Sequence, residues 1–402
     1  MVEPGRLRSA EARALETALA ALPPDPLARV SQLRRQFPDA DPDLVAACAT
    51  QARLREQARG RLDPWVDDLI LSDAGLQQAT RAVVARHRAG SLRARLATDG
   101  VIADLGCGLG IDSLALAEAG FEVEAIESDP WTAAAASLNT ATWTDRVRVR
   151  CADVADVDLD GCAAAFCDPA RRSPDGPANR AGTRTPAEAD PRQWSPPWPW
   201  VVALSARLPV VAKAAPGMSP AHVPGDAEIE WIACDGELVE ACVWFAPLAR
   251  NRRRATAISR GLVESVTDED HSTASMEAIG TYLLEPSPAV RRASLVDALA
   301  ARLEASRVSH HGSWLTSTVP RPSVLARTWH VVDEVPAHAA ELRERLRHRG
   351  SVTWKTRDVG LAAADMDAQV GHRPQRQGAP VTIAWIRGDE GPRAFEVEPV
   401  SP

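Results

Sequence analysis

Lysine is nearly absent from this chain of 402 residues, since only Lys213 and Lys355 stand among its 46 basic residues. The abundant arginine and alanine indicate codon bias toward GC, so arginine clusters carry little weight as functional evidence. The net charge of −8 is not that of a simple basic clamp on nucleic acid. No segment approaches the ~18 unbroken apolar residues of a membrane span, which excludes a transmembrane protein. The first residues lack the apolar core of a signal peptide, so we expect a cytoplasmic protein.

The cysteines give no sign of a metal site or a disulfide framework. All seven lie outside C-x-x-C pairs, and their number is odd. Reduced thiols in a reducing cytoplasm are therefore expected, and no metal ligand is predicted. Hydrophobic residues make up 45% and charged residues 25% of the chain, which is the ordinary mixture of a globular protein. The length favours roughly two to three domains.

The first part of the chain, up to about residue 95, has a helical pattern. Asp41 followed by Pro42 is a typical helix start, because the Asp side chain caps free N–H groups and Pro suits the first turn. A further helix is expected from near Ser72. Its buried stripe would consist of Leu76, Ala79, Val83 and Val84.

From Val101 onward, strands alternate with helices. Apolar segments predict strands at Val101–Ala103, Phe121–Ile126, Val147–Arg150 and Ala163–Cys167. Helices are expected over the intervening residues 111–119 and 131–138. This alternation is typical of a parallel sheet with covered faces, and it predicts an α/β fold.

A proline-rich segment at residues 173–200 interrupts the alternation. It holds seven prolines and the tryptophans Trp194, Trp198 and Trp200. Such a length is unusual for a connection in a compact domain, so we expect a functional lid or a mobile insertion. The tryptophans could offer a surface for base stacking or simply pack onto the domain.

The second half of the chain begins with a hairpin signal. Asp235-Gly236 predicts an antiparallel pair of strands at Glu228–Cys234 and Leu238–Phe245. A polar stretch at about residues 264–275 indicates a boundary. Beyond it, one helix is expected from Pro288, with a leucine stripe, and short strands follow. These elements predict a second, smaller α/β unit.

A glycine-rich turn joins the first strand to the following helix. Glycines there let the backbone approach a ligand, and a helix N-terminus offers free N–H groups. The alternative is a tight turn that holds no ligand. Glu127 lies 17 residues beyond Gly110 at the end of the second strand, where a carboxylate can bind both hydroxyls of a ribose. Asp153, after the third strand, could reach an adenine amino group or could cap a helix.

The segment from Asp104 to Gly110 resembles the first motif of class I S-adenosylmethionine-dependent methyltransferases, whose mark is an acid just before the glycines. Glu127, Asp153 and Asp168-Pro169 match the order and spacing of that family's later motifs. The resemblance covers about residues 95–250. It implies a Rossmann-like sheet with an antiparallel last strand and S-adenosylmethionine as the cofactor. The implied cofactor-binding residues are Asp104, Gly106, Gly108, Gly110, Glu127 and Asp153.

A narrower resemblance extends beyond this domain. The segments Leu76–Thr80, His87–Ala89, Lys213–Gly217 and Tyr282–Pro286 are similar to those of bacterial methyltransferases, common in actinobacteria, that carry a THUMP-like C-terminal domain. THUMP domains are associated with RNA, so the resemblance implies modification of structured RNA (tRNA or rRNA), with no DNA or membrane partner. It also implies three parts: a helical region at 1–95, the methyltransferase domain at 96–262 and the THUMP-like domain at 276–402.

Asp168 and Arg171 are the predicted catalytic residues, because they follow the fourth strand, beside the expected position of the methyl group. Asp168 could orient an amine or accept its proton, and Arg171 could hold a phosphate. Enzymes that methylate exocyclic amines of nucleic acids usually have an aromatic residue two positions after this proline, whereas this chain has Arg171. Cys167 could attack a pyrimidine ring, although a buried cysteine is more often inert.

Two arginine runs, at residues 250–254 and 343–349, are candidate nucleic-acid contacts or solvated surface. Residues 281–402 carry 16 basic and 14 acidic side chains, a net charge of +2, which favours this part as the RNA side. The sequence therefore predicts an RNA methyltransferase. The alternatives are a methyltransferase for a small molecule or a protein, and a non-catalytic protein that binds the cofactor or RNA.

Overall fold

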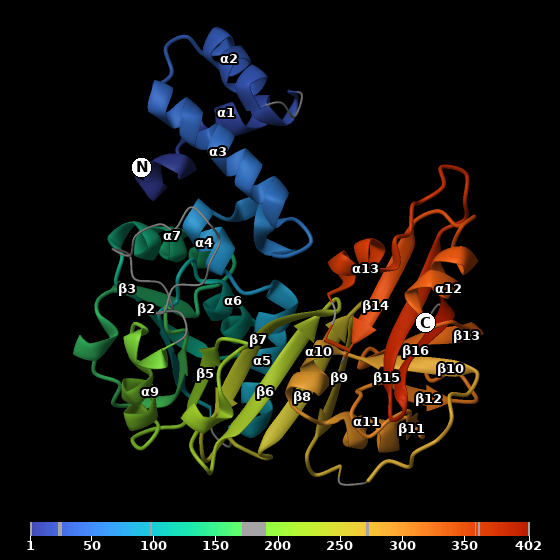
Figure 1. Ribbon diagram of the computed structural model, residues 1–402. Coiled ribbons are helices and arrows are strands. Elements are labelled where there is room, and N and C mark those ends of the chain that lie inside the picture. Colours follow the sequence, from blue (N-terminus) through green and yellow to red (C-terminus); the bar gives the residue numbers. More distant parts are fainter. Residues whose placement is uncertain are drawn as a thin grey trace. The chain divides into compact units, whose positions relative to one another are not determined.

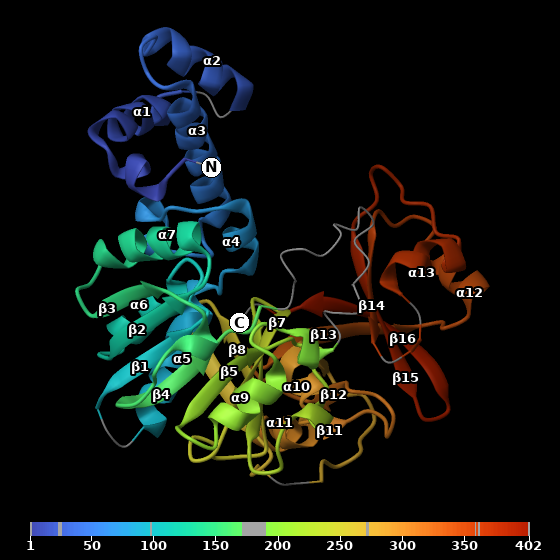
Figure 2. The ribbon, with the colours of Figure 1, turned by 90° about the vertical axis from the view of Figure 1, so that its left-hand side faces the viewer.

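The computed structural model describes residues 2–22, 26–96, 99–170, 190–270, 273–357, 359–360 and 362–400 (Figures 1 and 2). Its internal contacts divide the chain into two compact units. The first is Met1–Ala227 with Cys242–Ala249, and the second is Glu228–Ala241 with Arg250–Pro402.

The first unit begins with helices that pack against one another, as the sequence predicts (Figure 1). Asp41 accepts a hydrogen bond from the backbone N of Asp43 at 2.9 Å and Pro42 opens α3, which confirms the predicted cap. Leu15, Leu33 and Leu44 are among the fully buried side chains of this region. The elements are η1 (Pro4–Arg8), α1 (Ala10–Ala20), α2 (Pro26–Gln36), α3 (Pro42–Ala58), η2 (Trp65–Asp68), α4 (Asp73–Gln78) and α5 (Ala82–Arg95).

The predicted single helix from Ser72 is wrong, because the chain forms two helices there. Ser72 caps α4 as expected, but α4 ends at Gln78 and α5 starts at Ala82. Thr80, between them, is buried and forms side-chain hydrogen bonds that a continuous helix would not place there. Val83, expected in the buried stripe, is 44% exposed.

A nine-stranded mixed sheet follows, in the order β3-β2-β1-β4-β5-β7-β6-β8-β9. Its first five strands in sequence are parallel and confirm the predicted alternation: β1 (Val101–Leu105), β2 (Glu122–Glu127), β3 (Val147–Cys151), β4 (Cys162–Cys167) and β5 (Val210–Ala214). The connecting elements are α6 (Ile111–Glu118), α7 (Pro130–Ala141), η3 (Val154–Asp156), η4 (Pro191–Gln193), α9 (Trp198–Leu204) and η5 (Pro220–His222).

The strand order positions a site at one edge of this sheet. Leu105 at the end of β1 lies opposite Ile126 of β2 and Cys167 of β4. The carboxyl ends of these parallel strands are therefore level. The chain crosses to opposite sides of β1 to form β2 and β4, and ligands of open α/β sheets bind at such a switch point.

The predicted hairpin is present as β6 (Glu228–Cys234) and β7 (Glu237–Trp244). Asp235 and Gly236 both have positive φ, 50° and 82°, as the favoured two-residue hairpin turn requires. The sheet then continues beyond residue 262. Strand β8 (Arg253–Ser259) is parallel to β6, and β9 (Leu262–Thr267) is antiparallel to β8.

The second unit contains a separate seven-stranded mixed sheet in the order β11-β12-β10-β13-β16-β15-β14. Its strands are β10 (Tyr282–Pro286), β11 (Ser306–Arg307), β12 (Leu315–Ser317), β13 (Ala326–Val335), β14 (Val352–Arg357), β15 (Val381–Gly388) and β16 (Gly391–Pro399). Its helices are α10 (Pro288–Arg292), α11 (Val296–Arg302), α12 (Ala339–Arg345) and α13 (Ala363–Val370). The single helix predicted from Pro288 is wrong, because Ser294 has a φ of 57° and separates α10 from α11.

The arginine run at residues 250–254 is built into the second unit around Glu228, which is fully buried. The carboxylate of Glu228 accepts hydrogen bonds from the backbone N of Arg250 at 2.9 Å and from Arg254 Nε at 2.8 Å. Part of this run therefore has a structural role, because a buried carboxylate needs a partner of opposite charge.

We expect Arg254→Met to lower the free energy of unfolding by about 3–5 kcal/mol, since it removes the guanidinium that binds the buried Glu228 carboxylate. Arg376→Met is the control, because Arg376 is exposed and its loss should change stability by less than about 0.5 kcal/mol. Urea denaturation of both variants measures the difference, and equal losses would contradict a structural role for Arg254.

Among the described residues, the helices are all too short or too polar to cross a bilayer. The same part of the chain holds no group of three or more acidic, histidine or cysteine side chains arranged to bind a metal ion.

Candidate active site

The glycine turn after β1 has the backbone conformation that only glycine adopts readily. Gly106, Gly108 and Gly110 have φ values of 86°, 55° and 86°. A Cβ atom at Gly110 would lie 2.9 Å from the side chain of Thr140 in α7, so this position is crowded from behind. A Cβ atom at Gly108 would meet nothing within 4 Å, so the backbone of Gly108 faces open space.

Glu127, at the end of β2, is bonded to this turn. Its Oε2 accepts a hydrogen bond from the backbone N of Gly108 at 3.0 Å, and its Oε1 accepts one from the backbone N of Asp129 at 2.9 Å. The carboxylate thus lies beside the open face of Gly108. Its predicted contact with a ribose stays a prediction.

Asp104, the acid before the glycines, is fully buried at the end of β1. Its Oδ2 accepts a hydrogen bond from Ser113 Oγ in α6, whereas its Oδ1 has no partner among the described residues. Burial and the nearby carboxylate of Asp112 raise the pKa of Asp104 to about 8, and the bond from Ser113 opposes this shift. Asp104 is therefore largely protonated at neutral pH.

Asp168 follows β4 and lies against the glycine turn. A Cβ atom on Gly106 would lie 3.0 Å from the backbone O of Asp168. Lys213 of β5 donates a hydrogen bond at 2.8 Å to Asp168 Oδ2. The Lys213 side chain is 8% exposed and that of Asp168 27%, so the ammonium lies behind a carboxylate that reaches solvent. The sequence interpretation gave Lys213 no role, although its rarity among so many arginines was a usable signal.

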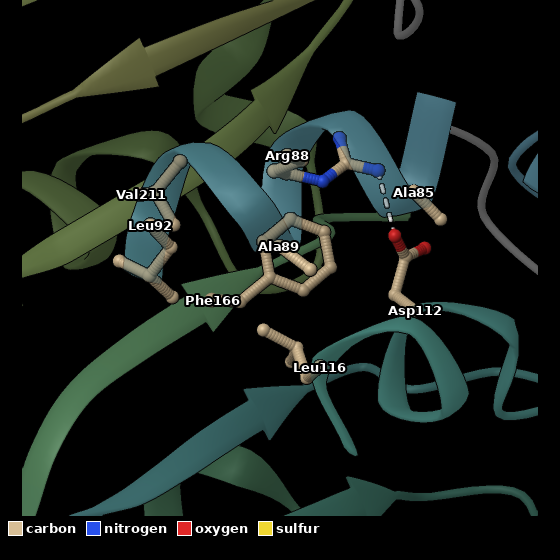
Figure 3. Close-up of a pocket in the computed structure, with 8 residues that line it drawn as sticks. All are labelled: Ala85, Arg88, Ala89, Leu92, Asp112, Leu116, Phe166 and Val211. Carbon is tan, nitrogen blue, oxygen red and sulfur yellow. Dashed lines mark hydrogen bonds and ion pairs between the residues drawn. The ribbon is translucent and has the colours of Figure 1, made fainter. Parts of the chain in front are cut away.

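A buried network of polar contacts connects Lys213, through Thr80, to the ion pair of Asp112 and Arg88. Thr80 Oγ1 accepts a hydrogen bond from Lys213 Nζ at 3.1 Å and donates one to Asp112 Oδ2 at 2.8 Å. Arg88 of α5 binds Asp112 Oδ1 at 2.7 Å and stacks over the ring of Phe166 in β4 at 4.5 Å (Figure 3). Burial acts to raise the pKa of Asp112, but Arg88 and Lys213 outweigh it and hold that pKa below its ordinary value.

A small cavity lies beside Arg88 and Asp112 (Figure 3). Apart from these two residues, its lining is apolar and comes from α5, α6 and the sheet. The apolar lining consists of Ala85, Ala89, Leu92, Leu116, Phe166 and Val211.

The other predicted site residues lie apart from this network or outside the described residues. Asp153 is exposed and accepts a hydrogen bond from the backbone N of Ala155 at 2.9 Å, which makes it the cap of η3. Arg171 is not among the described residues. Cys167 is fully buried, and burial raises the pKa of its thiol far above the ordinary value, which disfavours a nucleophilic thiolate there.

Two of the three tryptophans of the proline-rich segment pack onto the domain. Trp194 and Trp198 are buried and meet edge to face with ring centroids 5.9 Å apart. Trp198 Nε1 donates a hydrogen bond to the backbone O of His222 at 2.9 Å. These rings are therefore part of the core rather than a surface for stacking a base. Residues 173–189 of this segment lie outside the described residues.

The chain's residues fit S-adenosylmethionine at this edge of the sheet. The open face of Gly108 admits a ligand close to the backbone, and the adjacent Glu127 carboxylate suits a ribose. The unpartnered, buried Oδ1 of Asp104 provides a further polar atom at the turn.

Known proteins are similar to this chain over most of its length. The chain is 33% identical over 293 residues to the uncharacterized S-adenosylmethionine-dependent methyltransferase Rv3037c of Mycobacterium tuberculosis H37Rv, a match that covers 70% of this chain and 73% of the relative. The counterpart in strain CDC 1551, MT3122, matches equally. The crystal structure of a candidate methyltransferase from Porphyromonas gingivalis W83 has the same fold, with a TM-score of 0.71 at 20% identity, over 90% of this chain and 92% of that one. No family model matches the chain.

The chain belongs to the S-adenosylmethionine-dependent methyltransferases. The fold, the glycine turn and the relatives agree on this class of enzyme and on its cofactor.

The buried Asp104 should make stability depend on pH. Between its ordinary pKa of 3.8 and about 8, the folded protein keeps a proton on Asp104 that the unfolded chain has lost. Stability should therefore fall as pH rises through this window, whereas Asp104→Asn, which cannot titrate, should be spared. Thermal melts of the cofactor-free proteins from about pH 5 to about pH 8 measure the effect. As pH rises, the melting temperature of Asp104→Asn should increase relative to that of the wild type. A difference in melting temperature that stays constant with pH would contradict the raised pKa of Asp104.

Proposed function

We propose that this methyltransferase modifies structured RNA, tRNA or rRNA, at an acceptor group that lies beside Asp168. The observation that carries the position of the acceptor is the partly exposed Asp168 carboxylate against the glycine turn, held by the buried Lys213.

The ion pair with Lys213 also supports different roles for the two carboxylate oxygens of Asp168. Lys213 occupies Oδ2 at 2.8 Å, and no hydrogen bond to Oδ1 is found among the described residues. Oδ1 is therefore available to orient the acceptor and to take the proton that the acceptor loses. When bound, S-adenosylmethionine supplies an activated methyl group, so the chain's remaining task is to align the acceptor and exclude water.

Glu127, the glycine turn and Asp104 would hold the cofactor in this proposal, and Asp153 would contact its adenine. Arg171 would grip a substrate phosphate. The described part of the chain offers no aromatic ring directly after Asp168-Pro169, and Trp194 and Trp198 are buried. The site therefore suits an acceptor whose base need not stack on an aromatic ring better than it suits an exocyclic amine, whose base usually does.

Residues 281–402 carry a net charge of +2, and this part of the chain resembles THUMP-like domains. Both observations support RNA as the acceptor. In the arginine run at residues 343–349, several side chains are already ion-paired within the unit: Arg345 with Asp333, Arg347 with Glu344 and Arg349 with Glu396. Better candidates for phosphate contacts are the exposed Arg373, Arg376 and Arg387, for which the described residues show no ion pair.

Asp168→Asn should lower methyl transfer by roughly 10²–10⁴-fold, because it removes the proton acceptor. Cofactor affinity should stay within a few-fold, since the variant keeps the size of the side chain and leaves Glu127 and the glycine turn intact. Labelled cofactor is incubated with RNA from a strain that lacks the protein, and modified nucleosides are then identified. A stable Asp168→Asn enzyme with undiminished turnover would remove Asp168 from the active site.

The same assay separates the alternatives. Label in a metabolite or protein fraction but not in RNA would favour a small-molecule or protein methyltransferase. Retained cofactor without label in any fraction would favour a non-catalytic binding protein.

RNA binding by the full chain should weaken with salt, because phosphate contacts release counterions. The variant Arg373→Gln/Arg376→Gln/Arg387→Gln should reduce the slope of log affinity against log salt by up to about 3, roughly one for each lost phosphate contact. A matched control, Arg53→Gln/Arg59→Gln/Arg146→Gln, makes the same change in net charge on ion-paired arginines of the first unit. Equal effects of the two triples would contradict a specific RNA surface on residues 281–402.

A further inference from the structure

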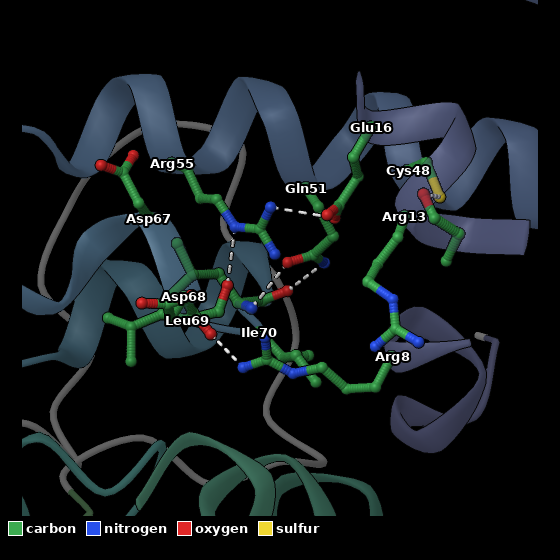
Figure 4. A network of polar contacts seen from close by, with 12 residues as sticks. Arg8, Arg13, Glu16, Cys48, Gln51, Arg55, Asp67, Asp68, Leu69 and Ile70 are labelled. Atoms are coloured by element: carbon green, nitrogen blue, oxygen red, sulfur yellow. Dashed lines mark hydrogen bonds and ion pairs between the residues drawn. The ribbon is translucent and has the colours of Figure 1, made fainter. Parts of the chain in front are cut away.

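The segment Leu69–Leu71, between η2 and α4, is extended and buried but belongs to no strand. Side chains satisfy its backbone instead of a neighbouring strand (Figure 4). Gln51 of α3 donates to the backbone O of Leu71 at 2.8 Å and accepts from its backbone N at 2.8 Å. Arg55 Nε donates to the backbone O of Leu69 at 2.9 Å. One edge of the segment is thus fixed by the N-terminal helices.

Asn139 of α7 fixes the other edge of the segment in the same way. Its Oδ1 accepts from the backbone N of Ile70 at 2.7 Å, and its Nδ2 donates to the backbone O of Ile70 at 3.1 Å. Gln51 and Asn139 therefore form equivalent two-bond pairs with adjacent residues of one segment. Both amides are buried, Gln51 at 4% and Asn139 at 0% exposure, so neither pair is replaced easily by water.

Asn139 differs from Gln51 in one respect. Its Nδ2 also donates to the backbone O of Leu109 at 3.1 Å. Leu109 lies in the glycine turn, between Gly108 and Gly110. The amide of Asn139 thus joins the extended segment to the turn that approaches the cofactor. Within the described part of the chain, the Gln51 bonds go to Leu71 and not to that turn.

Packing holds the turn in the same place. A Cβ atom on Gly75, in α4, would lie 2.7 Å from Cδ1 of Leu109, so the helix that follows the extended segment lies directly against this side chain. Thr140, next to Asn139, crowds the far side of the turn at Gly110. The turn therefore packs against α4 and α7, and Asn139 hydrogen-bonds it to Ile70 of the extended segment.

We infer that Asn139 is a positioning residue for the cofactor-binding turn, which it joins to Ile70 of the segment Leu69–Leu71. The inference rests on the proposed cofactor role of the glycine turn. Because coupling between two sites is reciprocal, cofactor binding should in turn stabilise the hydrogen bonds between Asn139 and Ile70.

The test compares Asn139→Ala with Gln51→Ala in the full-length protein. Each variant removes one amide and two bonds to the extended segment, so both should lower the melting temperature. Only Asn139→Ala also frees the Leu109 carbonyl, so it should weaken binding of S-adenosylmethionine about tenfold in calorimetry, while Gln51→Ala stays within about twofold. Equal affinities in the two variants would overturn the inference.

Gly108→Val separates this outcome from failure of the site itself. A side chain at Gly108 would fill the open space over the turn, so binding should be lost. If Gly108→Val binds like the wild type, the glycine turn is not the cofactor site. If Gly108→Val abolishes binding but Asn139→Ala does not weaken it, the glycine turn is the cofactor site but Asn139 does not position it.

Hydrogen exchange on the wild-type protein tests the coupling without any variant. Adding S-adenosylmethionine should slow exchange of the backbone amide of Ile70, which is bonded to Asn139, more than that of Leu71, which is bonded to Gln51. Equal changes at the two amides would overturn the inference even if Asn139→Ala fails to fold.

Discussion

The buried ammonium of Lys213 is the charge on which the rest of the site depends. It lies in β5 between Asp168, at the solvent side, and Thr80, on the interior side. Thr80 transmits the contact to Asp112, and Asp112 binds Arg88, which covers Phe166 of β4. The chain of contacts starts at Asp168, directly after β4, and ends at Phe166 within β4. Each of these charges has a partner of opposite sign, so removal of one member would deprive its neighbour of an ion pair in a medium that solvates charges poorly.

Through these contacts, the helices before β1 supply part of the environment of the candidate site at the sheet edge. Thr80 lies at the break between α4 and α5, and Arg88 belongs to α5, so both come from the region before the first strand. The sheet supplies Asp168, Lys213 and the glycine turn, and the preceding helices supply the groups that neutralise and enclose them. A chain that started at the first strand would keep the motifs of the family and lose part of the environment in which they act.

Local patterns in the sequence were sufficient for much of the fold. The parallel strands, the Asp41 cap and the Asp235-Gly236 turn each depend on a few adjacent residues, and the structure contains all of them. The two broken helices were missed because apolar spacing continues across each break. At Thr80 the break is associated with hydrogen bonds to Asp112 and Lys213, which are distant in sequence.

The candidate site likewise contains residues that local sequence patterns predict and residues that they do not. The glycine turn, Glu127 and Asp168 belong to short motifs at strand ends, so their common edge follows from the strand order. The sequence patterns gave no role to the partners of these residues. Lys213 and Asn139 act through contacts with residues 45 and 30 or more positions away, and no local pattern encodes such pairs.

The paired backbone of Ala170 and Ser195 has a consequence for how such an enzyme can change over time. These residues exchange hydrogen bonds of 2.7 Å and 3.0 Å, two positions after Asp168. The chain thus leaves the active-site edge and returns to it at one fixed point. Because this pair fixes the chain on both sides of residues 171–194, insertions or deletions between Ala170 and Ser195 would leave the position of Asp168 unchanged.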